Sequence, residues 1–572
     1  MNALTLQGSV RTGRADLVSG RLDALNIARL RVLWVAMGFA FLTLVAIVRV
    51  GYFGFANDDG DARSLSAGLP ERGELTDRNG VPLARAFMAQ SLLFNPKAMG
   101  DPTDPLVRSP QDIARELKAI FPDMDEALTV RRLQRTSSIT LRPRILDADK
   151  KRINDLGELA LEVPEEPDRN YPQGSMAAHV LGFVNSAGDG RIGMEKVLDA
   201  QLKDPARRGT PTPLSIDIRV QGALEDELRR GMLATNAMGA AGIILDVDTG
   251  EVMALASLPE FNPNKIDAAG QQHMFNRVTN QVYELGSTFK PLTVAAAIDA
   301  GVVRDFGFRW DARPIKVQGR TLRDSHDMGQ SLNVAETLIH SSNTTTARIA
   351  DELGATRMRQ VLVDLGMNDR PQIELNEKGF PIWPGKDWSR VRNMTVSYGH
   401  GVAVTPLHLA SAYAAMVNGG VWRPATLHRL AAEDVPEGRR VFKPSTSSRM
   451  RQLLRMIAKY GTGRKADAAG YRVGGKTGSA EKPTKGGYRE TSLISTFAAA
   501  FPMDDPRFVI VVMLDEPKGT TASSFQRTAA WNAAPIVGKI VPRVGPLMGI
   551  MPRTADHDID LSDLAPLIGE TH

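Results

Sequence analysis

The sequence contains no cysteine, and this absence excludes several chemistries together. Without thiols the chain forms no disulfide bond, uses no thiolate nucleophile and builds no cysteine-ligated zinc site. Histidine is also scarce: the 572 residues include nine, and none of them forms the H-E-x-x-H pair of zinc enzymes. We therefore expect neither a metal nor another cofactor.

Charge of one sign is not in large excess either. The net charge is +5 in a chain of which 24% of the residues are charged, and the surplus is spread along the sequence. It does not favour a nucleic-acid partner. With 42% hydrophobic residues, the composition is that of a folded protein. At about 150 residues per domain, the length allows about three or four domains.

Only one long apolar run occurs, from Val32 to Val48, and it resumes after one arginine as far as Phe55. That length is at the short end of a membrane-spanning helix. Five arginines precede the run and three aspartates follow it, so the positive-inside rule places residues 1–31 in the cytoplasm and the rest outside. A cleaved signal peptide is the alternative, but the leading segment is long and no clear A-x-A site follows it. We expect an uncleaved anchor at residues 32–55.

The region after the anchor, residues 56–219, mixes short strands with helical patterns. Asn79-Gly80 predicts a hairpin turn between two extended pieces. Amphipathic helical patterns follow over residues 110–160. Leu214–Ile218 has the pattern of a strand that closes this region.

The next region, residues 220–545, has strands at both ends. It opens with an apolar stripe at helical spacing, continues with a hairpin over residues 242–256 and ends with a strand pair over residues 493–514. Strands at both ends with helices between them predict an antiparallel sheet covered by helices, an α+β fold. Residues 546–572 include an acidic run and are expected to form a loose tail.

The tetrapeptide Ser287–Lys290 can supply a nucleophile and its base. Gly286 precedes it and an apolar stretch follows it, so we expect the serine at the start of a helix, with Pro291 in the first turn. At positions i and i+3 the serine and the lysine share a helix face. A partly desolvated lysine near other cations has a lowered pKa and can accept the serine proton. An isolated S-x-x-K match more often marks an ordinary solvent-facing helix.

Two further motifs follow the tetrapeptide. Ser341-Ser342-Asn343 offers a hydroxyl and an amide that can relay a proton and orient a substrate amide, although such a triplet is also a common helix cap. Lys476-Thr477 offers a cation and a hydroxyl for a carboxylate. The glycine after them, at position 478, would let a substrate backbone approach closely.

Residues 470–477 also fit the pattern G-x-x-x-x-G-K-T of phosphate-binding loops. Residues 509–516 resemble the apolar strand with an acidic end that holds magnesium in such ATPases. That interpretation requires a helix directly after the loop. Residues 478–487 contain proline and several glycines and cannot form one. The sequence therefore disfavours an ATPase.

In this order, S-x-x-K, S-x-N and K-T-G resemble the motifs of penicillin-binding proteins and serine β-lactamases. The arginine-rich stub, the single apolar run and four segments resemble the class B monofunctional transpeptidases; the segments are Arg72–Gly80, Arg169–Pro172, Tyr283–Pro291 and Ser397–Gly401. The resemblance implies a β-rich, elongated pedestal of the dimerisation type without catalytic residues, followed by the penicillin-binding transpeptidase fold. It also implies a bacterial inner membrane protein with a periplasmic catalytic body.

The resemblance assigns the acylation chemistry to four residues. Ser287 would attack the penultimate D-alanine carbonyl of a stem peptide and form an acyl-enzyme, with Lys290 as its base. Ser341 would pass a proton to the departing D-alanine. Asn343 would hold Lys290 and the substrate amide.

The resemblance likewise assigns substrate binding to the K-T-G segment. Lys476 and Thr477 would bind the terminal carboxylate, next to Gly478. The backbone N–H groups of Ser287 and Ser479 would form the oxyanion hole. Ser479 stands where many relatives have threonine, and it keeps both the hydroxyl and the N–H.

The partners implied are stem peptides with a D-Ala-D-Ala donor end and an amine acceptor, β-lactams, and a glycan polymerase with other division proteins. Asn343 in place of an aspartate, and Phe289 after Thr288, favour the division branch over the elongation branch. A scaffold or β-lactam sensor with the same fold is a further alternative. A β-lactamase needs neither a pedestal nor an anchor, so the sequence disfavours one.

Overall fold

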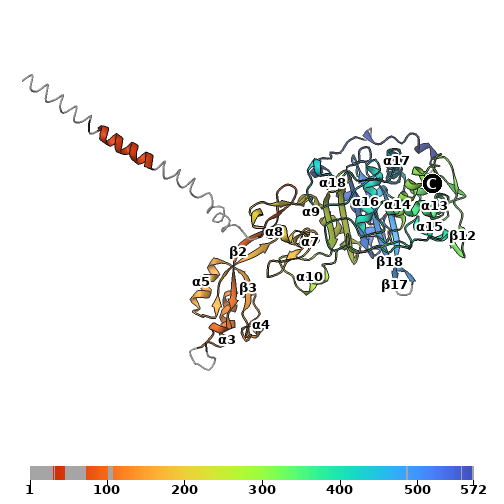
Figure 1. The fold of residues 1–572 in the computed structure, drawn as a ribbon. Helices are drawn as coiled ribbons and strands as arrows, with labels where there is room; N and C mark the ends of the chain where they lie inside the picture. Colours follow the sequence, from red (N-terminus) through yellow and green to blue (C-terminus); the bar gives the residue numbers. More distant parts are fainter. Residues whose placement is uncertain are drawn as a thin grey trace, which may run out of the picture. The chain divides into compact units, whose positions relative to one another are not determined.

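The chain divides into two compact units, Met1–Leu69 and Pro70–His572. The computed structural model describes residues 30, 32–45, 72–100, 107–484, 487–554 and 557–569. In the first unit, residues 32–45 are helical (Figure 1). Their side chains are exposed. Within the described ranges, no helix combines the length and the apolar character that crossing a membrane requires. Residues 46–55 of the predicted anchor lie outside the described residues.

The second unit begins with a six-stranded sheet. Its strands β1 (Leu75–Thr76), β2 (Pro82–Phe94), β3 (Ile139–Ile145) and β8 (Thr212–Pro213) lie in the order β3-β2-β1-β8, and β4 (Leu161–Glu162) and β5 (Glu165–Asn170) also pair with β2. β1 and β2 are antiparallel and flank the predicted turn, where Gly80 has a φ of +84°. Apolar side chains of α3 (Pro110–Ile120), α4 (Glu126–Leu133) and α5 (Asp147–Asp155) pack on the end of β2.

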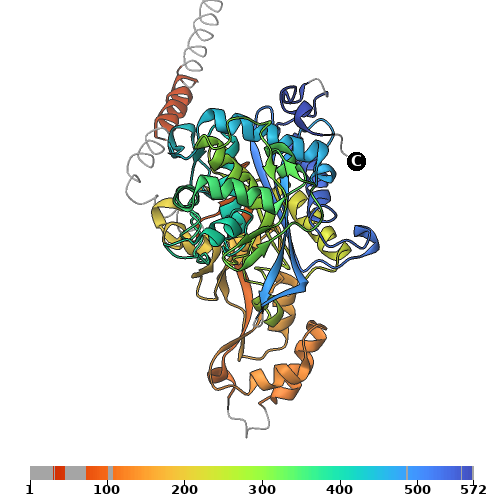
Figure 2. The same ribbon diagram turned by 90° about the vertical axis from the view of Figure 1, so that its right-hand side faces the viewer.

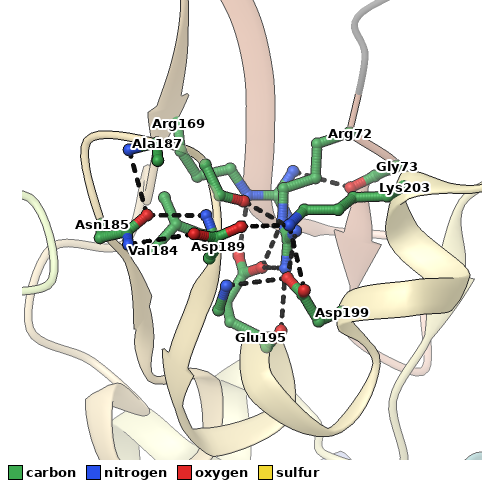
Figure 3. A network of polar contacts seen from close by, with 12 residues as sticks. Arg72, Gly73, Arg169, Val184, Asn185, Ala187, Asp189, Glu195, Asp199 and Lys203 are labelled. Carbon is green, nitrogen blue, oxygen red and sulfur yellow. Dashed lines mark hydrogen bonds and ion pairs between the residues drawn. The ribbon is translucent and has the colours of Figure 1, made fainter.

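A buried carboxylate joins three segments of this region. Glu195, in the short helix α7 (Gly193–Val197), is fully buried between two arginines (Figure 3). Its oxygens accept hydrogen bonds from Arg72 Nε at 2.8 Å and from Arg169 Nε at 2.7 Å. Arg72 also pairs with Asp199 at 2.8 Å, and Arg169 donates to the carbonyl oxygen of Gly73 at 2.7 Å. One carboxylate therefore holds the start of the unit against the end of β5 and against α7.

The sheet of the second region has five antiparallel strands within the described residues, in the order β10-β9-β19-β18-β17. They are β9 (Gly239–Asp246), β10 (Val252–Leu258), β17 (Gly474–Thr484), β18 (Gly487–Phe501) and β19 (Phe508–Asp515). β19 pairs with β18 on one side and with β9 on the other. The early and late hairpins therefore form one sheet, as the strand patterns predicted, and β17 lies at its edge.

Helices cover both faces of this sheet (Figures 1 and 2). Side chains alternate between two cores: Ile510 and Val512 pack with α9 (Ile218–Ala234) and α18 (Ala533–Val544). Val509 and Val511 face the other core, with α11 (Lys290–Asp299), α16 (Pro406–Val417) and α17 (Pro444–Tyr460). Burial on both faces explains why these strands are continuous apolar runs.

The shorter elements connect this framework. They are α6 (Ala178–Leu181), β6 (Phe183–Val184), β7 (Gly190–Ile192), α8 (Asp199–Lys203), α10 (Ala268–Gln272), β11 (Trp310–Asp311), β12 (Ile315–Val317), β13 (Arg320–Leu322), β14 (Ser331–Leu332), α12 (Val334–Ile339), α13 (Asn343–Leu353), α14 (Ala355–Asp364), α15 (Arg390–Val396), β15 (Val421–Trp422) and β16 (Arg439–Arg440).

The C-terminal segment differs from the loose tail that its acidic sequence suggested. Leu561 and Leu564 are buried in the core, 7% and 2% exposed. Asp558 forms an ion pair of 2.8 Å with Arg455 of α17, and the carbonyl oxygen of Leu567 accepts a 2.7 Å hydrogen bond from Asn333. Residues 557–569 are therefore a strap: their acidic groups meet basic side chains of α17, and two leucines fix the segment in place.

We expect Glu195→Gln to lower the free energy of unfolding by about 3–5 kcal/mol, because it leaves two buried guanidinium groups without their carboxylate. Asp189→Asn is the matched control: Asp189 pairs with Lys203 at 2.6 Å in the same network, but its side chain is half exposed. Its loss should cost about 0–1 kcal/mol. Urea unfolding followed by circular dichroism measures both, and equal losses in the two variants would contradict this account.

Candidate active site

Ser287 lies on a short 3-10 turn, η3 (Gly286–Phe289), that runs directly into α11. The serine is half-buried, whereas the rest of the turn is buried. The hydroxyl of Tyr413 in α16 donates to the carbonyl oxygen of Thr288 at 2.8 Å and so holds the turn against the core. The predicted position at a helix start is confirmed, with a 3-10 turn in place of the first α-helical turn.

Lys290, the first residue of α11, is fully buried. Its Nζ donates to the hydroxyl oxygen of Ser341 at 3.0 Å and also to the carbonyl oxygen of the same residue. Burial, and then the charge of Lys476, hold the pKa of Lys290 well below its usual value, while the charge of Asp324 opposes this shift. The lowered pKa favours the neutral amine, the form that accepts a proton.

Ser341 occupies the turn between α12 and α13. Its φ is +63°, in the left-handed region that residues other than glycine rarely adopt. This conformation lets both its hydroxyl and its carbonyl oxygen contact Lys290. The next residue, Ser342, caps α13 by accepting a 3.2 Å hydrogen bond from the N–H of Thr345. The triplet is therefore both a helix cap and part of the site.

The side chain of Asn343 contacts the loop at residue 323. Its amide donates to the carbonyl oxygen of Arg323 at 3.4 Å. Within the described part of the chain it makes no hydrogen bond with Lys290. The structure thus brings Ser341 to Lys290 but directs Asn343 toward the loop at residue 323.

Asp324 is a residue of the site that the motifs did not indicate. Its carboxylate accepts a 2.8 Å hydrogen bond from the Ser342 hydroxyl, a 2.6 Å bond from the Thr344 hydroxyl and a further bond from the N–H of Asn343. These contacts fix the residues that follow Ser341. Asp324 stands in a loop without a distinctive pattern, so no sequence signal identified it.

The K-T-G segment lies on β17, at the edge of the sheet. Lys476 is fully buried, and its Nζ donates to the carbonyl and hydroxyl oxygens of Thr477, both at 3.2 Å. Burial lowers the pKa of Lys476 to about 7. Residues 474–484 are one continuous strand, not a loop followed by a helix. The phosphate-loop interpretation is therefore wrong.

Gly478 lets the nucleophile turn lie directly against β17. A Cβ atom at this position would lie 2.4 Å from the carbonyl oxygen of Leu285, a distance that real side chains do not reach. A Cβ on Gly286 would lie 3.0 Å from the carbonyl oxygen of Ser479. The backbone segments that carry Ser287 and Ser479 are therefore in contact, and their N–H groups belong to neighbouring stretches of chain.

The loop Ser397–Gly401 supports the turn from another side. A Cβ on Gly399 would lie 2.1 Å from the carbonyl oxygen of Gly286, so only glycine allows this approach. His400 follows, and burial together with the charge of Lys290 lowers its pKa. Its Nδ1 lies 3.7 Å from the carboxylate of Glu284. In the sequence, only the resemblance to a known family marked this loop. In the structure, the loop packs against the turn that carries Ser287.

A cavity of about 210 Å³ opens beside the end of β17. It is lined by segments that flank the site, with Tyr283 and Glu284 just before the turn, Glu481 and Lys482 on the strand, and Ile382 from a nearby loop. Among the described residues, no cluster of histidine, aspartate and glutamate side chains is arranged to hold a metal ion.

Two family models match the chain. The penicillin binding protein transpeptidase domain matches residues 240–541. The penicillin-binding protein dimerisation domain matches residues 68–210.

Whole-length relatives agree with these matches. A probable peptidoglycan D,D-transpeptidase FtsI from Caulobacter vibrioides is 36% identical over 92% of this chain and 90% of its own length. The peptidoglycan D,D-transpeptidase FtsI of Escherichia coli K12 is 29% identical, over 86% and 87%. The crystal structure of penicillin binding protein 3 from Mycobacterium tuberculosis in complex with aztreonam shares the fold, with a TM-score of 0.66 at 22% identity, over 85% of this chain and 98% of that chain. The chain therefore belongs to the class B penicillin-binding proteins, in their division-type branch.

Proposed function

We propose that this chain is a peptidoglycan D,D-transpeptidase of the division septum, which cross-links stem peptides through an acyl-enzyme on Ser287 and is inhibited by β-lactams. The observation that carries the proposal is a fully buried lysine, Lys290, three residues from an accessible serine and hydrogen-bonded to Ser341. Membership of a family whose relatives carry the name peptidoglycan D,D-transpeptidase supports the same activity.

In the acylation step, neutral Lys290 accepts the hydroxyl proton of Ser287, whose oxygen attacks the carbonyl carbon of the penultimate D-alanine. The N–H groups of Ser287 and Ser479 stabilise the oxyanion. As the peptide C–N bond breaks, the proton on Lys290 passes through the Ser341 hydroxyl, 3.0 Å away, to the departing amine of D-alanine. Asn343 orients the substrate amide; a contact with Lys290 requires its side chain to leave Arg323.

The terminal carboxylate of the donor peptide binds at the edge of β17, to Lys476 and Thr477. An edge strand offers unpaired backbone groups along which an extended peptide can lie. In the second step an amine of a neighbouring stem peptide attacks the ester carbon, its proton is taken by Lys290, and the Ser287 oxygen leaves and recovers a proton. A β-lactam copies the D-alanyl-D-alanine end and stops after acylation.

The proposal also covers the domain organisation of the chain and its topology in the membrane. Residues 1–31 are a cytoplasmic stub, 32–55 a single-pass anchor in the bacterial inner membrane, 56–219 the pedestal, 220–545 the transpeptidase domain and 546–572 the C-terminal segment. The apolar run, with exposed side chains over its helical part, supports the anchor. The catalytic body is then periplasmic and works beside a glycan polymerase and other division proteins.

Ser287→Ala should abolish covalent labelling by a fluorescent penicillin, because no other group of the site forms the ester. Thr321→Ala, at an exposed threonine of β13, is the control and should be labelled like the wild-type protein. Gel fluorescence reads both. Labelling that survives Ser287→Ala would overturn the assignment of the nucleophile.

The acylation rate constant for a penicillin should show a bell-shaped pH profile. On the acid side it falls as Lys290 becomes protonated and loses its function as a base. On the alkaline side it falls above about pH 7, because burial lowers the pKa of Lys476 to about 7 and a neutral lysine holds a carboxylate less well. The methyl ester of the same penicillin should lack the alkaline fall. Identical alkaline limbs for acid and ester would contradict this role of Lys476.

Depleting the protein in cells should produce filaments, since septal cross-linking would stop while elongation continued. Rounded cells would instead favour the elongation-type alternative, and unchanged growth with a Ser287→Ala copy would favour a scaffold or sensor.

In the same strain the full chain should restore division. A chain without residues 1–55, exported on a cleaved signal peptide, should not restore it, because it lacks the anchor.

A further inference from the structure

Thr462 contacts the carboxylate-binding segment although it belongs to none of the three motifs. It lies in the turn that follows α17 and is half-exposed. Its Oγ1 is 2.7 Å from Oγ1 of Thr477 on β17. The two hydroxyl groups therefore share a hydrogen bond at the place where the proposed function puts the substrate carboxylate.

The turn that carries Thr462 is fixed by close packing. A Cβ on Gly461 would lie 2.8 Å from the carbonyl oxygen of Ile339, the last residue of α12, and one on Gly463 would lie 3.2 Å from the carbonyl oxygen of Ile457. Arg455 of α17 donates to the carbonyl oxygen of Val473, directly before β17, at 2.8 Å. Thr462 is therefore held at a set distance from the strand.

The hydrogen-bond partners of the Thr477 hydroxyl determine what Thr462 can contribute. A threonine hydroxyl has one proton and two acceptor positions. Lys476 Nζ donates to Thr477 Oγ1 at 3.2 Å and fills one of these positions. If Thr462 donates to the other, the proton of Thr477 has no partner in this group and is free to point at an incoming carboxylate. If Thr477 donates to Thr462 instead, the carboxylate must first break that bond.

We propose that Thr462 is a positioning residue for carboxylate recognition: it donates to Thr477 when substrate binds and turns the Thr477 proton toward the terminal carboxylate. The inference rests on the proposed function and deepens it. The ligand class is a peptide or β-lactam with a free carboxylate next to the scissile amide. Thr462 does not touch the reacting atoms, so its effect is confined to substrates that carry this group.

The test compares a penicillin with its methyl ester on the full-length protein, by the second-order rate constant of acylation. Thr462→Val should lower this constant about five- to tenfold for the penicillin, the effect of one hydrogen bond between uncharged groups, and by less than about twofold for the ester. Thr462→Ser keeps the hydroxyl and should stay within about twofold of the wild type for both. Thr462→Ala removes the hydroxyl without adding a methyl group and should match the valine variant.

Repeating the measurement in a protein that also carries Thr477→Val separates this positioning role from a packing defect. In a Thr477→Val protein the Thr462→Ala change should have no further effect on the penicillin, because the hydroxyl through which it acts is absent. Equal losses for penicillin and ester, no loss for either, or a full further loss in the Thr477→Val background would each overturn the proposal. Absence of penicillin labelling at Ser287 in the wild-type protein would instead overturn the proposed function itself.

Discussion

Burial of the Lys290 amine without a bonded carboxylate is the constraint on which the rest of the site depends. A charged lysine is costly to bury, and Lys476 nearby raises that cost. Its hydrogen-bond partners are the hydroxyl and carbonyl oxygens of Ser341, which can accept from an ammonium group and also from a neutral amine. The base can therefore lose its proton without losing its position. This arrangement requires the left-handed turn at Ser341, and Asp324 holds that turn by binding the residues directly after it.

The fold around this lysine was largely predictable, since its signals are local. Apolar runs and turn residues marked the hairpins β9–β10 and β18–β19, and strands at both ends of the region with helices between them predicted their pairing into one antiparallel sheet. The nucleophile turn was likewise marked by its glycine and by the apolar helix after it. The spacing of Ser287 and Lys290 is a property of three consecutive peptide units, so a sequence pattern is enough to place the two on one face.

Residues that act through tertiary contacts could not be predicted in this way. Asp324 and Thr462 stand in loops of ordinary composition, and only the fold brings their oxygens to Ser342 and Thr477. The strap at residues 557–569 shows the same limit. Its acidic residues suggested a solvated tail, because the basic side chains of α17 that they meet lie about a hundred residues away in the sequence. Asn343 is the opposite case. Its motif was evident in the sequence, but the sequence did not indicate that its side-chain amide donates to the carbonyl oxygen of Arg323.

Gly478 belongs to a motif that is visible in the sequence and also makes a close contact that only the fold creates. In a phosphate-binding loop, the residues after Lys476-Thr477 would begin a helix, whereas here they continue an edge strand whose outer side has no strand partner among the described residues. A side chain at position 478 would collide with Leu285, so any larger residue would push the strand away from the turn of Ser287. Separation there would also move Thr477 from Thr462 and the Ser479 N–H from the nucleophile. The missing side chain therefore sets the distance between the acylating serine and the edge on which a substrate can lie.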